Sequence, residues 1–533
     1  MIHKDLKKAV FLALLAGTLS YTNVYAAESA DNANPMQLIY EQSAYNPHLQ
    51  DAVVAADESM VKIESGSIRG SVHEGVYQYL GVPYAEAKER FVKAEKVTPW
   101  EGIRDMTDYG HQCPQYLFGT KQPLTDVPTS NNAQNLNIWT NSLDRKAKKP
   151  VMVWLHGGGF SSGSANEAQY DGENLSRKGD VVVVGVNHRL NALGHLDLSA
   201  YGEKYQDSAN AGGTDLVAAL QWIHDNIQQF GGDPKNVTIF GESGGGSKVL
   251  ELMSAPSAKG LFQKGIIESG AVERNGVFFN SSAMSQEIAA ETLKNLNLAA
   301  ENVEELQKMP IEKIWQASDR ALQTVGEKYK IPNTIGSGYV AFWEPVTGTR
   351  FLPDEPVTDK GFATSGKNVA LMIGSNLTEW STILSSAAHK DMTQEQKNMF
   401  AKAYPNEDIS SAPYVDTLLR PSLLKVMAYK ADQGGAPVYA YVFTKQIGEA
   451  GVYHTAEIPY IFNNLKEESA LADTMTKLWS SFAWTGIPSA AGVPEWKPYT
   501  RQNGNTMLLD DKSELVQHHD EELLHSLMSD WQY

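Results

Sequence analysis

Runs of consecutive apolar residues constrain the fold of this chain more than any other feature. Residues 151–155 (VMVWL), 180–186 (DVVVVGV) and 237–240 (VTIF) are short and rich in β-branched side chains. Such runs are typical of parallel strands that are covered on both faces. Between the second and third runs, apolar residues recur at spacings of four, three, four and three, which predicts an amphipathic helix. These residues are Leu216, Leu220, Ile223, Ile227 and Phe230.

The alternation continues through residues 265–267, 369–373 and 438–443. Alternating strands and helices predict an α/β fold with a large, mostly parallel central sheet, helices on both faces and right-handed crossovers. Residues 61–70 and 76–81 predict short strands at an antiparallel edge, and residues 282–330 predict helical cap segments.

One of the apolar runs leads into Gly241-Glu242-Ser243-Gly244-Gly245, with a helix-forming stretch after it. A strand, a sharp glycine-rich turn and a helix with serine at the apex form the nucleophile elbow of α/β-hydrolases. The same Gly-x-Ser-x-Gly pattern also occurs around Ser161, but no helical stripe follows that copy. We therefore interpret Ser243 as the nucleophile and Ser161 as part of a loop.

A second glycine-rich segment, His156-Gly157-Gly158-Gly159-Phe160, directly follows the run at 151–155. Ester hydrolysis places negative charge on the former carbonyl oxygen, and backbone N–H groups must point at it. Consecutive glycines allow this, as in the HGGG loop of esterases. The expected donors are the N–H groups of Gly158, Gly159 and Gly244; the alternative is a merely flexible glycine turn.

A serine nucleophile needs a histidine base, and the histidine needs an acid that fixes its tautomer. In α/β-hydrolases both follow the serine in the order acid, then histidine. His454 lies in a polar loop after the strand ending at residue 443, and Glu379 lies just past the strand ending at residue 373. Other acids remain alternatives to Glu379 at this point. The other histidines after the serine lie in a loop or in the charged C-terminal segment: His389, His518, His519 and His525.

Charge and the N-terminal sequence limit the expected partners and the cellular location. The 533 residues carry a net charge of −18, which argues against a nucleic-acid partner. Residues 1–26 combine Lys4, Lys7 and Lys8 with an apolar stretch too short to span a bilayer, and they end in Val-Tyr-Ala. This predicts a signal peptide cleaved after Ala26, hence a secreted or periplasmic protein; the alternative is a buried apolar helix.

Several further expectations follow from the chain as a whole. No cysteine stands at a lipid-attachment site, and no later run is long enough to span a membrane. Residues 27–58 predict an exposed extension, and residues 59–533 a single catalytic domain. The one cysteine, Cys113, excludes an internal disulfide and is expected to be buried. No cofactor or metal is expected, and the oligomeric state is open.

Taken together, these motifs resemble the type-B carboxylesterases, which include the cholinesterases and bacterial esterases active on p-nitrobenzyl esters. The resemblance covers about residues 60–515 and rests on YLGVPYA (79–85), HGGGF (156–160), FGGDPKNVTIFGES (230–243), GSNLTE (374–379), HTAEIPYIF (454–462), FAWTGIP (482–488) and EWKPY (495–499). It implies a triad of Ser243, Glu379 and His454. It further implies a serine beside the acid, Ser269, and a structural ion pair between Arg189 and Asp215.

The chain departs from the family pattern at several positions. Ala133 replaces the cysteine that would pair with Cys113, so that disulfide is absent, and Asn131 replaces the glutamate expected to pair with Arg90. Gly244 replaces alanine, and the sequence leaves open whether this loosens the elbow or admits a bulkier acyl group. Trp380 replaces the glycine that usually follows the acid, and its ring is expected either to shape the pocket or simply to pack.

The sequence thus predicts an exported serine esterase that acts on small to medium esters through an acyl-enzyme. A non-catalytic binding or adhesion protein on the same fold is the alternative from another class, since fold does not dictate function. Amidase or thioesterase activity would use the same site.

Overall fold

The computed structural model describes residues 53–117, 120–334, 337–358, 360–384 and 390–528. The predicted signal peptide lies outside these residues, as does most of the predicted extension at 27–58. Of the extension, residues 53–58 lead into a short 3₁₀ turn at Asp57–Ser59. Within the described residues, no helix combines the length and apolarity needed to cross a bilayer.

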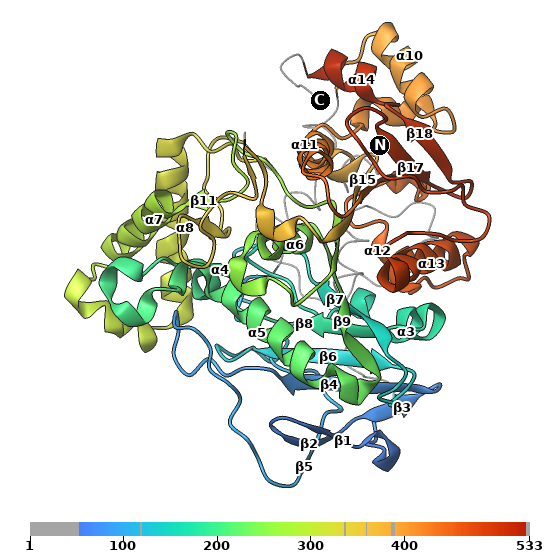
Figure 1. The fold of residues 1–533 in the computed structure, drawn as a ribbon. Coiled ribbons are helices and arrows are strands. Elements are labelled where there is room, and N and C mark those ends of the chain that lie inside the picture. The colour runs from blue at the N-terminus through green and yellow to red at the C-terminus, as the bar shows by residue number, and fades with distance from the viewer. Residues whose placement is uncertain (1–52, 118–119, 335–336, 359, 385–389, 529–533) are drawn as a thin grey trace, which may run out of the picture.

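A mixed sheet organises the molecule (Figure 1). Across the described residues it has eleven strands in the order β18-β17-β16-β15-β10-β9-β7-β8-β6-β4-β3. The seven strands from β17 to β8 run parallel, and the strands at both edges are antiparallel. Its strands are β3 (Ser71–His73), β4 (Val76–Pro83), β6 (Asn135–Thr140), β7 (Lys149–Leu155), β8 (Val182–Val186), β9 (Gly232–Glu242), β10 (Lys264–Glu268), β15 (Ala370–Asn376), β16 (Val438–Phe443), β17 (Asn505–Leu509) and β18 (Glu514–Gln517).

Smaller sheets lie outside the main one. Three strands near the N-terminus form a separate sheet, and two pairs of very short strands accompany the loops around residues 280 and 360. They are β1 (Val61–Ile63), β2 (Gly66–Arg69), β5 (Ile103–Asp105), β11 (Asn280–Ser281), β12 (Val346–Thr347), β13 (Val357–Thr358) and β14 (Gly361–Phe362).

The central strands are buried on both faces, which explains their unbroken apolar sequence. In β7, Val151, Val153 and Leu155 join one hydrophobic core, whereas Met152 and Trp154 point into the other. Side chains alternate between the faces of a strand, so a strand between two cores has no polar side. The predicted α/β fold with a mostly parallel sheet is confirmed.

Helices cover both faces. One core packs under α5, α6 and α11, and the other packs under α3, α12 and α13. The helices are α3 (Glu173–Gly179), α4 (Asn191–His195), α5 (Ala211–Asn226), α6 (Gly244–Ser254), α7 (Ser282–Asn295), α8 (Ile311–Tyr329), α9 (Glu379–Leu384), α10 (Gln394–Ala403), α11 (Leu419–Asp432), α12 (Ile458–Phe462), α13 (Ala470–Thr485) and α14 (Glu521–Leu527). The predicted stripe of residues 216–230 lies on α5 and on the 3₁₀ turn Ile227–Phe230, which ends at Gly231 with a φ of 77°.

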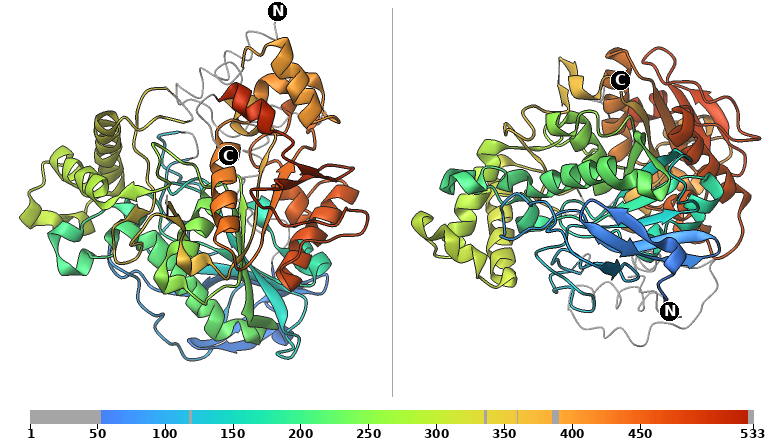
Figure 2. Two further views of the ribbon diagram at one scale, coloured as in Figure 1. Left: turned by 45° about the horizontal axis from the view of Figure 1, so that its top comes forward. Right: turned by 60° about the horizontal axis from the view of Figure 1, so that its bottom comes forward.

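The predicted helical cap consists of α7, α8 and the 3₁₀ segment Ala300–Gln307, which share a third core with α4. Figures 1 and 2 show α7 and α8 on one side of the main sheet, away from α10 and α14. Trp315 of α8 donates a hydrogen bond of 3.1 Å to Asn191 at the start of α4. Because α4 follows the carboxyl end of β8, this contact ties the cap to the edge of the sheet where the parallel strands end.

Candidate active site

Five neighbouring strands deliver the predicted site residues to one edge of the sheet. In sheet order these strands are β16, β15, β10, β9 and β7, and all five are parallel. Parallel strands end at the same edge, where α/β folds commonly bind ligands. The segments after these strands carry, in the same order, His454, Glu379, Ser269, Ser243 and the glycine loop of residues 156–160.

Ser243 stands at the apex between β9 and α6. Its φ of 56° and ψ of −123° lie in a region that residues with a Cβ rarely adopt, and its N–H donates a 2.8 Å hydrogen bond to the carbonyl of Glu268. The residue is partly exposed. The strained turn predicted for the elbow is thus present, with the serine accessible at the end of a helix.

The glycines after Ser243 are required by close packing. A Cβ on Gly245 would lie 1.9 Å from the carbonyl oxygen of Leu155, and one on Gly244 would lie 2.3 Å from that of Gly159. The backbone of Gly159 occupies the space that an alanine side chain at position 244 would need.

His454 and Glu379 form a short pair in the interior. Nδ1 of His454 lies 2.5 Å from Oε2 of Glu379, and both side chains are buried. The other carboxylate oxygen, Oε1, accepts hydrogen bonds of 2.6 Å from the hydroxyl of Ser269 and the N–H of Asn376. This arrangement holds the imidazole in the tautomer with its proton on Nδ1 and leaves Nε2 as a proton acceptor.

The acceptor nitrogen of His454 faces the residue before the serine. Nε2 lies 3.1 Å from Oε1 of Glu242 but makes no hydrogen bond with any described residue. Burial lowers the pKa of His454 to about 4, against the opposing effects of Glu457 and Asp416. The ring is therefore neutral at pH 7, as a general base must be.

Sequence reasoning missed how many acids surround this histidine. Glu242, Glu268 and Glu457 are buried close to Glu379, and burial together with their mutual repulsion raises the pKa of Glu242 and Glu457, the latter to about 7. Burial and Asp416 likewise raise the pKa of Glu379, whereas its hydrogen bonds from Ser269 and Asn376 lower it. The only signal in the sequence is that two of these acids directly precede Ser243 and Ser269.

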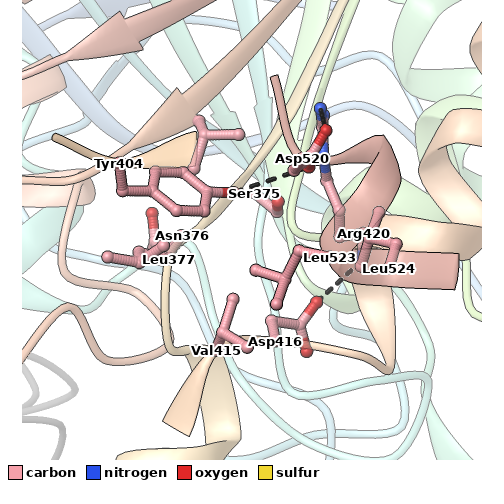
Figure 3. A pocket seen from close by; sticks show the side chains of 11 residues that line it. Ser375, Asn376, Leu377, Tyr404, Val415, Asp416, Arg420, Asp520, Leu523 and Leu524 are labelled. Carbon is pink, nitrogen blue, oxygen red and sulfur yellow. Dashed lines mark hydrogen bonds and ion pairs between the residues drawn. The ribbon is translucent and has the colours of Figure 1, made fainter. Parts of the chain in front are cut away.

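A buried cluster braces the loop that carries Glu379 (Figure 3). Asp416 accepts hydrogen bonds from three backbone N–H groups at residues 418–420, and its own N–H donates to the carbonyl of Leu377. The side chain of Arg420 in turn pairs with Asp520 at 2.8 Å. A cavity of about 10 Å³ lies among these side chains, room for about one water, so it is too small for a substrate.

The glycine loop folds back toward the elbow. Gly158 and Gly159 have φ values of 82° and 62°, which favour glycine, and both are accessible. No described residue accepts a hydrogen bond from either N–H. The N–H of Gly244 belongs to the first residue of α6, where helical N–H groups lack an intrahelical partner. Three unused N–H groups therefore lie near Ser243.

Trp380 covers one face of the candidate histidine. Its ring lies over that of His454, with ring centroids 4.4 Å apart and an interplanar angle of 32°. The same ring also packs against the core under α5, α6 and α11, so the structure does not separate the two roles left open by the sequence, shaping the pocket or packing.

The alternatives for these roles lie elsewhere or outside the described residues. Ser161 is exposed in a loop, and His389 is not among the described residues. His518 is partly exposed, His525 is exposed, and the side chain of His519 is buried against Tyr404.

Arg90 and Cys113, whose expected family partners are replaced in this chain, have other surroundings in the structure. Arg90 donates to the carbonyls of Leu306 and Met309 in the cap, not to residue 131. Cys113 is free and buried, as expected, and burial raises the pKa of its thiol to about 12.

The expected ion pair is present in the interior. Arg189 donates two hydrogen bonds, of 2.8 and 2.7 Å, to the carboxylate of Asp215, and both side chains are buried. A paired, bidentate geometry compensates the cost of burying two charges.

An eleven-stranded sheet with a strained serine elbow, a glycine loop and a paired acid and histidine at one edge defines an α/β-hydrolase. The sequence profile described as "Carboxylesterase family" matches residues 57–414 and 410–525. The chain belongs to the carboxylesterase family, and it is a carboxylesterase in enzyme class.

Individual relatives agree with this assignment. The para-nitrobenzyl esterase of Bacillus subtilis is 33% identical over 492 residues, which cover 85% of this chain and 95% of that protein. A medium-chain fatty acyl-CoA hydrolase precursor from Anas platyrhynchos is 31% identical, over 83% of this chain and 87% of its own length. Among solved structures, an esterase from Clostridium hathewayi that can hydrolyse aliphatic aromatic polyesters is 35% identical, with a TM-score of 0.78 over 89% of this chain and 98% of its own.

Proposed function

We propose that the protein is an exported serine carboxylesterase that works through an acyl-enzyme on Ser243, with Glu379 and His454 completing the triad. The observation that carries the proposal is the 2.5 Å contact between Glu379 and Nδ1 of His454, because it leaves Nε2 unbonded beside the strained elbow. Ser269 supports the acid through its 2.6 Å hydrogen bond.

In the proposed reaction, the ester carbonyl oxygen binds to the N–H groups of Gly158, Gly159 and Gly244. Ser243 attacks the carbonyl carbon while His454 takes its proton at Nε2, and the N–H groups stabilise the oxyanion. The protonated His454 then gives the proton to the departing alcohol. Water, deprotonated by His454, attacks the acyl-enzyme and releases the acid together with free Ser243.

The proposed substrates are small to medium esters. The names of the relatives refer to p-nitrobenzyl esters, fatty acyl-CoA and aliphatic aromatic polyesters. Together these names cover a broad range of acyl and alcohol groups. The acyl-CoA relative makes thioesterase activity the second candidate. A panel of p-nitrophenyl esters of rising chain length, run beside the matching acyl-CoA thioesters, separates the two by their kcat/KM values.

Export is the second part of the proposal, supported by the signal-like pattern of residues 1–26. The full chain expressed in a Gram-negative host should be recovered from the periplasm with Ala27 as its first residue, as shown by N-terminal sequencing. Recovery of uncleaved chain in the cytoplasm would contradict it.

Substitution of the nucleophile tests the catalytic proposal. Ser243→Ala should reduce hydrolysis of p-nitrophenyl acetate and butyrate by a factor of roughly 10⁴–10⁶. Ser161→Ala is the matched control, since it removes the serine of the other Gly-x-Ser-x-Gly segment, and it should keep wild-type turnover. Full activity in Ser243→Ala would show that another residue is the nucleophile, and failure of the wild type on every ester would favour a binding protein.

A further inference from the structure

A lysine is buried beneath the glycine loop. Lys248, on α6 and five residues after Ser243, has 0% exposure. Its ammonium donates a 2.8 Å hydrogen bond to the carbonyl of His156 and lies 5.4 Å from the centre of the Phe160 ring. These two partners are the first and last residues of the glycine loop, so one side chain contacts both ends of the segment that contains the three glycines.

Burying an ammonium group is costly unless it is compensated. Burial lowers the pKa of Lys248 to about 7, and the carboxylates of Glu251 and Glu167 oppose this shift. The hydrogen bond to the loop and the cation–π contact supply the remaining compensation. An apolar residue at this position of α6 would stabilise the packing of the helix on the sheet without this cost. We therefore attribute the role of the ammonium to its contacts with the glycine loop.

Two further carbonyls of the loop also have partners. The ring Nδ1 of His156 lies 2.9 Å from the carbonyl of Gly157, which belongs to the same peptide group as the N–H of Gly158. The N–H of Ser162 donates a 3.1 Å hydrogen bond to the carbonyl of Gly158, which shares a peptide group with the N–H of Gly159. The two donors of the glycine loop, the N–H groups of Gly158 and Gly159, therefore lie on peptide groups whose carbonyls already have a partner, which fixes the direction of each N–H and polarises it.

Lys248 completes this set. We propose that Lys248 is a positioning residue for oxyanion stabilisation: its ammonium fixes His156 and Phe160, and thereby holds the N–H groups of Gly158 and Gly159 in the direction of the substrate oxygen. The inference rests on the proposed function of the site. In this role Lys248 acts through the backbone of the glycine loop without touching the substrate, and in its protonated form its positive charge favours the negative charge that develops beyond the loop.

The test compares Lys248→Met with Lys430→Met. Lys430 is a matched control because it is equally buried on α11 and donates to two backbone carbonyls, those of Lys367 and Ala436, which precede β15 and β16 at the opposite edge of the sheet. Each variant is assayed for thermal unfolding, for kcat and KM on p-nitrophenyl butyrate, and for inhibition by an alkyl trifluoromethyl ketone. This inhibitor adds to the serine and forms a tetrahedral oxyanion.

Lys248→Met should weaken the ketone by roughly 10- to 100-fold and lower kcat/KM by the same factor, less than the loss of an oxyanion donor itself. Most of this change should fall on kcat, because the loop acts in the transition state. Lys430→Met should leave both constants within about twofold of wild type, even where it lowers the Tm equally.

A second substitution at Lys248 keeps the test decisive if Lys248→Met does not fold. Lys248→Gln keeps an N–H donor, one bond closer to the backbone, but carries no charge, so it should fall between wild type and Lys248→Met in ketone affinity. Wild-type ketone affinity in either folded Lys248 variant would overturn the inference, as would an equal loss in Lys430→Met. Loss of the proposed function would look different, because the wild-type enzyme itself would then neither hydrolyse the ester nor bind the ketone.

Discussion

The indole ring of Trp380 lies over the imidazole of His454, with ring centroids 4.4 Å apart. Trp380 directly follows Glu379 at the start of α9. One short segment therefore supplies both the carboxylate that contacts Nδ1 of His454 and the indole that lies over its ring. In the proposed reaction, His454 becomes positively charged when it takes the proton from Ser243. An aromatic face next to a cation is favourable, so Trp380 is placed to stabilise the charged form.

Removing this ring should slow catalysis. Trp380→Ala is expected to lower kcat/KM by about 2- to 30-fold, corresponding to a cation–π contribution of about 0.5–2 kcal/mol. Trp380→Phe keeps an aromatic face and serves as the control, with most of the activity retained. Steady-state kinetics on p-nitrophenyl butyrate check this, and an unchanged kcat/KM in Trp380→Ala would show that the ring only packs.

The loss of activity at acidic pH should occur at a lower pH than the ordinary pKa of histidine would give. Burial lowers the pKa of His454 from 6.5 to about 4, and only the neutral ring accepts the proton of Ser243. Activity is therefore present above the folded-state pKa and lost as the pH falls through it. We expect kcat/KM for a neutral ester to stay near its maximum at pH 6 and to reach half of it at about pH 4, in the range where circular dichroism still shows folded protein. Half-loss at pH 6.5 in folded enzyme would contradict the burial argument.

Gly244 should not tolerate the alanine that is usual at this position in the family. A Cβ there would lie 2.3 Å from the carbonyl oxygen of Gly159, so Gly244→Ala has to displace the glycine loop. Since removing one oxyanion donor costs about 10²–10³ in kcat, we expect a loss of roughly 10-fold or more.

A distant glycine separates this effect from strain alone. Gly260 also has a positive φ, of 88°, but a Cβ on it would meet no atom within 4 Å. Gly260→Ala should lower stability without lowering kcat. If Gly244→Ala keeps wild-type kcat, the loop adapts freely and the close packing has no catalytic role.

Cys113 should be unreactive in the folded protein. Its side chain is buried beside Leu190, whose N–H lies 3.3 Å from the sulfur, and burial raises the pKa of the thiol to about 12. Since the thiolate is the reactive form, a disulfide reagent such as Ellman's reagent should modify one thiol in denaturant and almost none in the native state over the same time. Rapid modification of the native protein would indicate an accessible sulfur.

The sequence predicts the parts of this structure that depend on local pattern. The strand positions follow from apolar runs that have a core on each side, as in residues 151–155, and the strained serine follows from glycines at fixed offsets. Glu379 and His454 are found because parallel strands deliver their following loops to one edge.

Contacts between segments that are distant in the sequence cannot be predicted from such local patterns. Lys248 meets the carbonyl of a residue 92 positions earlier, and the fit of Gly244 against Gly159 depends on how the glycine loop is placed over α6. For the same reason, the glycine pattern alone does not show that another backbone fills the space beside Gly244. The stacking of Trp380 on His454 likewise depends on where two loops meet.

The central claim is that Ser243 is the nucleophile activated by His454. The most direct measurement is intact-mass and peptide-mapping analysis of the protein after treatment with a fluorophosphonate, which phosphonylates activated serines. We expect one adduct per chain, located on Ser243, with none on Ser161, none in Ser243→Ala and strongly slowed labelling in His454→Ala. An adduct on a different serine, or a folded wild-type protein that is not labelled, would contradict the account.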